Sequence, residues 1–190
     1  MRNILILFLL IFLFFSCGES LNYKYNEQHQ VINCSETNNL LINEALYSFE
    51  SDLLAYHIAR NIDEEQHYLY MAYASFAYPA AMNEIDFNSM LSNHTKEVIL
   101  ALRNEDDLWL VKSGQRELNY KSDLMTCLID GINDEKLQSN LRSLISIDGM
   151  NSKLMADPYR VRIMRAMDNK EFAMFLALEL FYQHTINLGE

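Results

Sequence analysis

Glu64 and His67 are the residues of this 190-residue chain whose spacing best suits metal chemistry. Side chains three positions apart lie on the same side of a helix, so a Glu-x-x-His pair can direct a carboxylate and an imidazole at one ion. His57 lies one helix earlier and is the third candidate ligand. We therefore treat Glu64, His67 and His57 as a candidate metal site.

A Glu-x-x-His pair resembles half of the di-iron site of ferritin-like bundles, and that resemblance implies a second such pair and two further carboxylates. The rest of the sequence does not supply them. Glu179 and His184 are five residues apart instead of three, and His94 comes before Glu97, which reverses the order of the motif. Glu64 also follows Asn61 by three residues, a spacing typical of a capping box. A helix-start role for Glu64 is the competing interpretation, and we expect no cofactor.

Cys17 has its own chemistry, set by the residues before it. Apolar residues occupy positions 4–15, Arg2 supplies a positive start, and the small Ser16 precedes the cysteine. Twelve helical residues rise about 18 Å, which is short of a hydrocarbon core of roughly 30 Å. The pattern is typical of a secretory signal peptide, which we assign to residues 1–16.

The Ser16-Cys17 step resembles the lipobox of bacterial lipoproteins, whose cysteine carries a diacylglyceryl group on sulfur and becomes the first mature residue. Phe14 and Phe15 resemble the looser lipobox of Bacteroidota. The resemblance implies that Cys17 is lipidated and that two or three acyl chains, such as palmitate, hold the chain in the membrane. Each buried CH₂ contributes about 0.8 kcal/mol, so such attachment is nearly permanent. The alternative is an ordinary signal peptide that leaves Cys17 as a free thiol.

Three longer segments, LLINEALYSFESDLLAY, LNY and LALELFY, resemble a family of uncharacterised small lipoproteins from flavobacteria. The resemblance covers most of the mature chain and implies no known activity. Gly18 stands where an aspartate would resemble an inner-membrane retention signal. We therefore expect an extracytoplasmic, membrane-anchored protein, with the outer membrane or a periplasm-facing position favoured.

Cys34 and Cys127 remain if Cys17 carries lipid, and an extracytoplasmic compartment permits them to form a disulfide. A bridge that encloses about 90 residues would stabilise the fold by roughly 4 to 5 kcal/mol in the chain-entropy model. Two buried thiols that pack as small hydrophobic side chains are equally compatible with the sequence. The spacing alone leaves both alternatives open.

The composition indicates an all-α fold. The chain has two prolines and five glycines, too few turn-formers for a many-stranded barrel or sandwich. We predict a polar tether over 17–34 and, over 35–190, a single bundle-like domain of about six or seven helices. The net charge of −11 argues against an electrostatic nucleic-acid interface.

The first domain helix carries an apolar seam at steps of four and three residues, which predicts its packed side. The acids Glu44, Glu50 and Asp52 are then expected on the outer side. A second helix should follow through residues 66–78 and end before Pro79. The seam consists of Ile42, Leu46, Phe49, Leu53 and Tyr56.

Later segments predict a loop and two further helices. Residues 105–120 read as a loop that carries Leu108, Trp109 and Leu110 onto the core. Asp157-Pro158 is typical of a helix start. The run EFAMFLALELFYQH is apolar nearly all round, which predicts a central helix. This region also contains a basic stretch, which we expect to form ion pairs with acids of the same chain. The alternative is that the stretch docks a partner. Its members are Arg160, Arg162, Arg165 and Lys170.

Catalytic motifs are missing from the sequence: it has no glycine-rich phosphate loop, Gly-x-Ser-x-Gly, His-Glu-x-x-His or zinc-like cysteine pair. No catalytic residue is predicted. We expect a lipid-anchored protein that acts by contact with an unknown envelope protein or as a structural accessory. A small-ligand or metal-binding helical bundle is the alternative.

Overall fold

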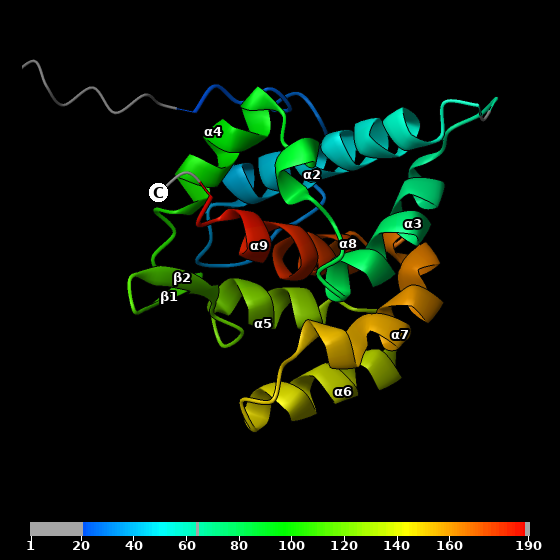
Figure 1. Ribbon diagram of the computed structural model, residues 1–190. Helices are drawn as coiled ribbons and strands as arrows, with labels where there is room; N and C mark the ends of the chain where they lie inside the picture. The colour runs from blue at the N-terminus through cyan, green and yellow to red at the C-terminus, as the bar shows by residue number, and fades with distance from the viewer. Residues whose placement is uncertain (1–20, 64, 189–190) are drawn as a thin grey trace, which may run out of the picture.

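The computed structural model describes residues 21–63 and 65–188, so the predicted lipidation site Cys17 and the candidate ligand Glu64 lie outside the described residues. It is mostly helical, with one small two-stranded sheet, which confirms the predicted all-α class (Figure 1). The helices are α2 (Asn39–Arg60), α3 (Leu69–Ala81), α4 (Asn93–Leu102), α5 (Asp123–Asp130), α6 (Glu135–Ser146), α7 (Ser152–Arg162), α8 (Lys170–Ala177) and α9 (Gln183–Thr185). Short 3₁₀ turns form η2 (Phe87–Met90) and η3 (Ile163–Met167), and a π-helical segment forms η4 (Leu178–Tyr182). None of the helices in the described ranges is both long and apolar enough to cross a bilayer.

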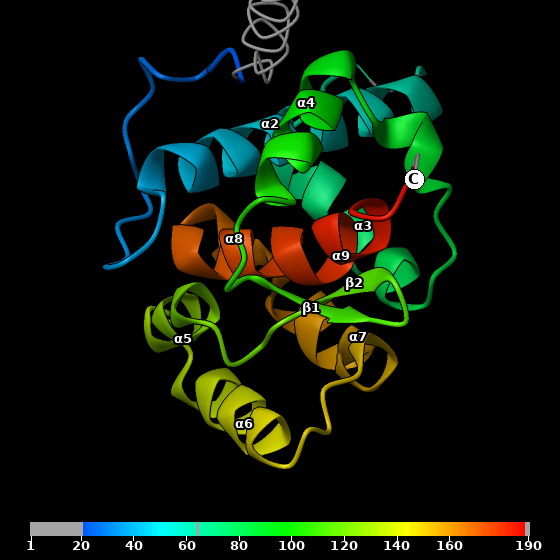
Figure 2. The same ribbon diagram turned by 90° about the vertical axis from the view of Figure 1, so that its left-hand side faces the viewer.

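The continuous helix formed by α8, η4 and α9 occupies the centre of the molecule. Two views show α2 and α4 on one side of it and α5 with the β-hairpin on the other (Figures 1 and 2). Every residue from 172 to 182 is buried. The prediction of a central helix over this apolar run is therefore confirmed.

Helix α2 buries its predicted seam, with Tyr56 partly exposed at its end. The acids expected on its outer side are also buried, so that prediction is wrong. The reason is that neighbouring elements cover α2 and supply partners: Glu50 accepts from Nζ of Lys170 at 2.6 Å, and Asp52 accepts from the backbone N–H of Ser92 at 2.9 Å. A buried carboxylate is tolerated where such donors satisfy it.

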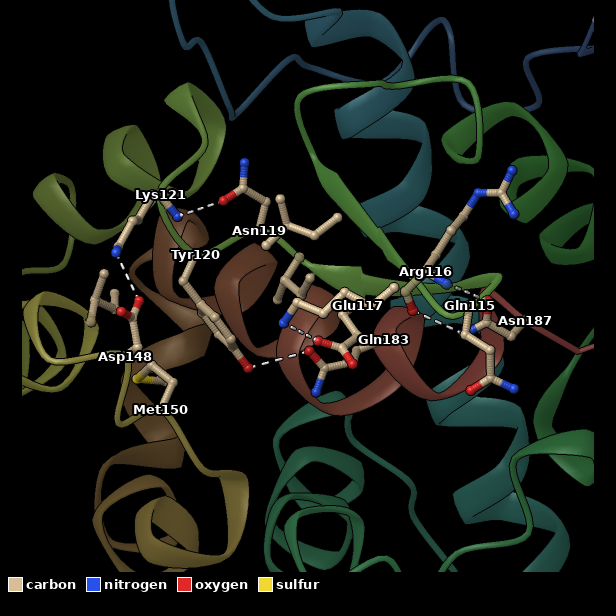
Figure 3. A pocket seen from close by; sticks show the side chains of 14 residues that line it. Gln115, Arg116, Glu117, Asn119, Tyr120, Lys121, Asp148, Met150, Gln183 and Asn187 are labelled. Carbon is tan, nitrogen blue, oxygen red and sulfur yellow. Dashed lines mark hydrogen bonds and ion pairs between the residues drawn. The ribbon is translucent and has the colours of Figure 1, made fainter.

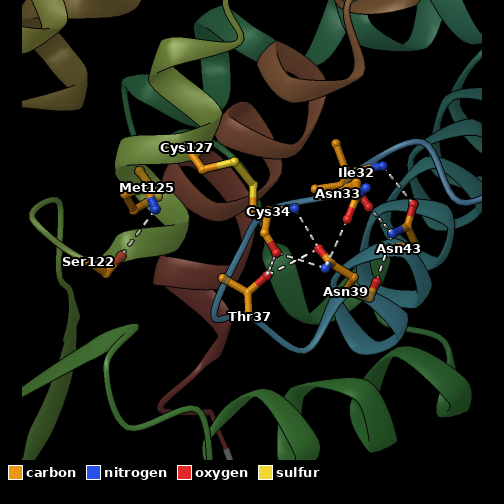
Figure 4. The surroundings of a disulfide bond; sticks show 9 residues. All are labelled: Ile32, Asn33, Cys34, Thr37, Asn39, Asn43, Ser122, Met125 and Cys127. Atoms are coloured by element: carbon orange, nitrogen blue, oxygen red, sulfur yellow. Dashed lines mark hydrogen bonds between the residues drawn. A yellow bond between two sulfur atoms is a disulfide. The ribbon is translucent and has the colours of Figure 1, made fainter.

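Residues 21–34, where we predicted a tether, contact α2 at several points, and Figure 4 shows the contacts made by residues 32–34. The Asn43 side chain accepts the N–H of Ile32 at 3.0 Å and donates to its carbonyl at 2.8 Å. Glu44 accepts the N–H of Lys24 at 2.6 Å and that of the following residue at 2.9 Å. Polar side chains of α2 thus take up backbone groups that a free tether would leave to water.

A disulfide joins Cys34 to Cys127 on α5 (Figure 4). The two residues are 93 positions apart, and their Cα atoms lie 5.9 Å from each other. Of the two alternatives that the sequence left open, the structure contains the bridge. It ties the docked N-terminal segment to the opposite side of the central helix.

The region predicted as a loop contains a β-hairpin of β1 (Trp109–Lys112) and β2 (Gln115–Leu118). The strands pair antiparallel, from Trp109 opposite Leu118 to Lys112 opposite Gln115. Ser113 and Gly114 connect them with φ angles of 52° and 82°. Positive φ at both central residues matches the twist of a two-residue hairpin, so the loop assignment is wrong for these strands.

Burial in this region follows the prediction only in part. Leu108 and Trp109 are buried, and the indole N–H of Trp109 donates to the carbonyl of Leu102 at 2.7 Å. Leu110 is 43% exposed, because successive strand residues point to opposite sides. The prediction that Leu110 packs on the core is therefore wrong.

Both prolines lie inside helices, contrary to prediction. Helix α3 begins at Leu69 and continues past Pro79, and α7 begins at Ser152, six residues before Pro158. A proline removes one helical hydrogen bond, here to the carbonyl of Leu154, whose side chain is exposed to solvent. Each helix therefore continues through its proline with one backbone hydrogen bond fewer.

The basic stretch near the C-terminus pairs internally, as predicted. Arg162 and Arg165 both contact Asp134, at 2.9 and 2.8 Å. The backbone N–H of Leu137, with Arg162, holds the pKa of Asp134 below its ordinary value. Arg160 pairs with an acid one turn before it, and Lys170 pairs with Glu50 on α2.

Candidate functional site

A pocket of about 570 Å³ lies between the β-hairpin, the link from β2 to α5, the turn between α6 and α7, and the end of α9 (Figure 3). We call it the hairpin pocket. Its volume is within the range of small-molecule sites, about 300 to 1,000 Å³. Three stretches that are distant in the sequence, 110–121, 145–150 and 183–187, therefore form one concave surface.

The charged side chains of the hairpin pocket are paired. Nζ of Lys112 lies 2.6 Å from Oε2 of Glu117, and Nζ of Lys121 lies 2.7 Å from Oδ1 of Asp148. The hydrogen bond from Lys121 lowers the pKa of Asp148. Arg116 also has a partner. The lining is therefore polar, and two of its three cations form ion pairs within it.

Carboxamides supply much of the remaining polarity. Asn119 accepts the N–H of Lys121 at 3.2 Å, which fixes the link after β2. Asn187 accepts the N–H of Arg116 and donates to its carbonyl, both at 2.9 Å, so it caps the outer edge of β2. Gln115 and Gln183 complete the set of four. Each carboxamide can both donate and accept hydrogen bonds.

A buried acid lies behind the wall of the hairpin pocket. Glu179 is 0% exposed, and its carboxylate accepts hydrogen bonds from the hydroxyls of Tyr120 and Ser152, the latter at 2.7 Å. Tyr120 lines the hairpin pocket, and its hydroxyl also lies 3.2 Å from Oε1 of Gln183 (Figure 3). Tyr120 therefore connects the pocket to the buried acid.

Burial controls the ionisation of this pair. It raises the pKa of Glu179 from 4.5 to about 7, because the two hydroxyl donors only partly replace water. Burial and the adjacent Glu179 also raise the pKa of Tyr120, so the phenol keeps its proton. Among the described residues, no cationic side chain forms an ion pair with Glu179. Its charge near neutral pH is therefore set by the solution.

The π-helical segment η4 is where the central helix carries this acid. Glu179 is the only acid in the apolar run 172–182, and it lies in the wider turn of η4. Gln183 follows directly after η4 and lines the hairpin pocket. Single π turns within α-helices are frequent at functional sites.

The predicted metal ligands are only partly brought together. The rings of His57 and His67 lie 5.6 Å apart, edge to face, at the connection of α2 and α3. Nδ1 of His57 lies 3.2 Å from Oγ of Ser75, which is not a metal-type arrangement. Within residues 21–63 and 65–188, no three His, Cys, Asp or Glu side chains are placed to hold a metal ion. Glu64 is outside those ranges.

Sequence reasoning did not identify Tyr120 or Glu179 as a pair. A single glutamate inside the apolar run LALELFY was an available indication, because an acid on a fully packed helix needs a buried partner. Nothing local to Tyr120 indicates its role. The two residues are 59 positions apart, so only the packing reveals the contact.

Comparisons with known proteins match no family model, no curated protein and no solved structure. The residues and geometry described above are therefore the basis of the functional proposal.

Proposed function

We propose that this protein is a lipid-anchored, extracytoplasmic helical domain of the bacterial cell envelope, and that it acts through non-covalent contact as an accessory. The anchor is the acylated Cys17, which the Ser16-Cys17 lipobox pattern favours. The partner is an envelope protein. The net charge of −11 supports a partner other than nucleic acid.

The disulfide between Cys34 and Cys127 is the observation that carries this proposal. Cys34 is 2% exposed, and the bridge connects two parts of the core. Structural disulfides of this kind persist in oxidising compartments and are rare in the bacterial cytoplasm. The bridge therefore supports export, which a lipoprotein signal peptide requires.

The docked N-terminal segment supports a close attachment to the membrane. Lys24, whose N–H is held by Glu44, lies seven positions after Cys17. Fully extended, that stretch reaches at most about 25 Å. A lipid on Cys17 would therefore keep the side of the domain with α2 and α4 near the bilayer, while the α6 and α7 end points away (Figure 1).

An exposed apolar stripe on α7 and η3 is the contact surface that we propose. Leu154, Val161 and Met164 are 67%, 72% and 50% exposed. Steps of seven and three residues bring them to one side of the chain. Asp157 and Arg160 lie between them and form an exposed ion pair. Apolar side chains bordered by charges are typical of protein contact sites.

Fractionation of cells tests the anchor. We expect wild-type protein to enter the detergent phase after phase separation, and Cys17→Ala to lose this behaviour or to remain unprocessed. Ser20→Ala is the matched control, because it changes a small side chain close after Cys17 but keeps the acylated residue. Equal detergent partitioning of Cys17→Ala and wild type would contradict the proposed anchor.

Site-specific photocrosslinking in cells tests the contact. A crosslinker at Val161 should yield one reproducible adduct, and Leu154→Glu should reduce it. A crosslinker at Leu100, on α4 and 56% exposed, is the control on the side assigned to the membrane. No consistent adduct at Val161, or equal adducts at both positions, would show that the stripe is not the contact surface.

A further inference from the structure

We propose that the hairpin pocket binds a neutral polyhydroxyl ligand, a short oligosaccharide, and that Tyr120 is a recognition residue in it. This inference goes beyond the accessory function and does not depend on the lipid anchor. It rests on the size of the pocket, the pairing of its charges and the hydrogen-bonding groups that line it.

The charge pairing favours a neutral ligand. Lys112 pairs with Glu117 and Lys121 with Asp148, and Arg116, the remaining charged residue of the lining, has a contact of its own. An anionic or cationic ligand would first have to separate these exposed pairs, a small cost that a neutral ligand does not meet. The overall charge of −11 further disfavours an anion.

The lining groups match hydroxyls rather than charged groups. A sugar hydroxyl both donates and accepts, and so does each lining carboxamide, such as that of Gln115 or Gln183. Apolar side chains, among them Ile145 and Met150, lie beside these polar groups. Such a mixture suits a pyranose ring, which has polar edges and apolar C–H faces.

The hairpin geometry disfavours a peptide strand as the occupant. A peptide that extends a sheet needs the free N–H and C=O groups of an edge strand. On β2, the N–H and C=O of Arg116 are both bonded to the side chain of Asn187. Recognition in this pocket must therefore use side chains, as it does for sugars.

The buried acid gives Tyr120 a fixed role. Its O–H donates to the carboxylate of Glu179, which leaves the lone pairs of the phenolic oxygen able to accept a hydrogen bond at the wall of the pocket. Ser152 holds the other carboxylate oxygen at 2.7 Å. Glu179 is thus a positioning residue, and Tyr120 is the group that accepts a hydrogen bond from a ligand hydroxyl.

Calorimetric titration of the full chain tests the proposal. The protein is kept in a zwitterionic detergent, because detergents with sugar headgroups would compete. The neutral probes are maltotriose and the trimer of N-acetylglucosamine, which separate a plain glucan from an acetylated amino sugar. Trigalacturonate, a trisaccharide with three carboxylates, and trialanine are the probes for an anion and a peptide.

We expect saturable binding of at least one neutral trisaccharide and at least about tenfold weaker binding of trigalacturonate and trialanine. Tyr120→Phe keeps the ring and should weaken binding about tenfold, which is the loss of one hydrogen bond. Tyr68→Phe is the matched control, since that exposed tyrosine lies outside the pocket. Gln115→Ala alters an exposed lining residue without touching the core, and should also weaken binding.

Other results would overturn the inference. Absence of binding by both neutral trisaccharides would exclude this ligand class, and tighter binding of trigalacturonate or trialanine would replace it. Unchanged affinity in both Tyr120→Phe and Gln115→Ala would show that the sugar binds elsewhere. None of these outcomes affects the anchoring or crosslinking tests, so the two proposals fail separately.

Discussion

Replacement of Glu179 by glutamine is expected to remove a large part of the pH dependence of stability between about pH 4.5 and 7. Glu179 is fully buried beneath the hairpin pocket and is held by two hydroxyl donors, Tyr120 and Ser152. Glutamine has the same shape and can still accept from one donor. The substitution therefore removes the ionisable group with little change in packing.

The sign follows from the two states of the carboxyl group. Unfolded, Glu179 has its ordinary pKa of 4.5; folded, burial raises the pKa to about 7. Between these values the folded protein binds more protons, so its free energy of unfolding falls as the pH rises and levels off above pH 7. The interval corresponds to about 3 kcal/mol for this group.

Urea unfolding, followed by circular dichroism at pH 5, 6, 7 and 8, measures this effect. From pH 5 to pH 8 the free energy of unfolding of the wild type should fall by somewhat less than about 3 kcal/mol relative to that of Glu179→Gln. The remainder of the fall occurs below pH 5. At pH 5 the two proteins should be close in stability. Glu117→Gln is the control, because that carboxylate is exposed beside the same pocket.

Parallel pH profiles for wild type and Glu179→Gln would refute the reasoning. They would mean that Glu179 has the same pKa in both states, and hence that water or a cation reaches it in the folded protein. A wild type that instead gains stability relative to the variant as the pH rises would show that the ionised form is favoured by folding.

Three further predictions concern the disulfide, the docked N-terminal segment and the turn of the β-hairpin. The double variant Cys34→Ser, Cys127→Ser should lose about 4 kcal/mol of unfolding free energy, measured in urea under oxidising conditions, and a loss below about 1 kcal/mol would contradict a structural role for the bridge. Asn43→Ala should cost about 3 kcal/mol and expose the N–H of Ile32 to hydrogen exchange, because that buried group loses its acceptor; unchanged protection would contradict the docking. Gly114→Ala should destabilise the protein by about 1 kcal/mol, because alanine is strained at a φ of +82°, while its Cβ would meet no atom within 4 Å. The fluorescence of Trp109 on β1 measures this loss during unfolding. Unchanged stability would argue against this turn.

Local patterns in the sequence predicted the helical class and two of its main helices. The seam of α2 and the apolar run 172–182 are visible because helix periodicity is a property of neighbouring residues. The same reasoning could have found the hairpin, since Ser113-Gly114 separates two short strands. It failed at Pro79 and Pro158, where packing keeps the helix intact despite one missing hydrogen bond.

The candidate site was beyond such reasoning. The metal hypothesis used Glu64 and His67 because their three-residue spacing is readable along the chain, whereas the hairpin pocket collects residues from 110 to 187. The partners that matter are remote: Tyr120 meets Glu179 across 59 positions, and Lys170 meets Glu50 across 120. No local pattern encodes those contacts.

What the sequence by itself determined is the periodicity of the helices, the acidic balance and the apolar run that precedes Ser16 and Cys17. The tertiary structure decided which polar groups are buried, that Cys34 and Cys127 are joined, and that the segment 21–34 packs on α2. The physical reason is that apolar spacing acts through adjacent turns of one helix. The environment of an acid such as Glu179 depends instead on every element that packs around it.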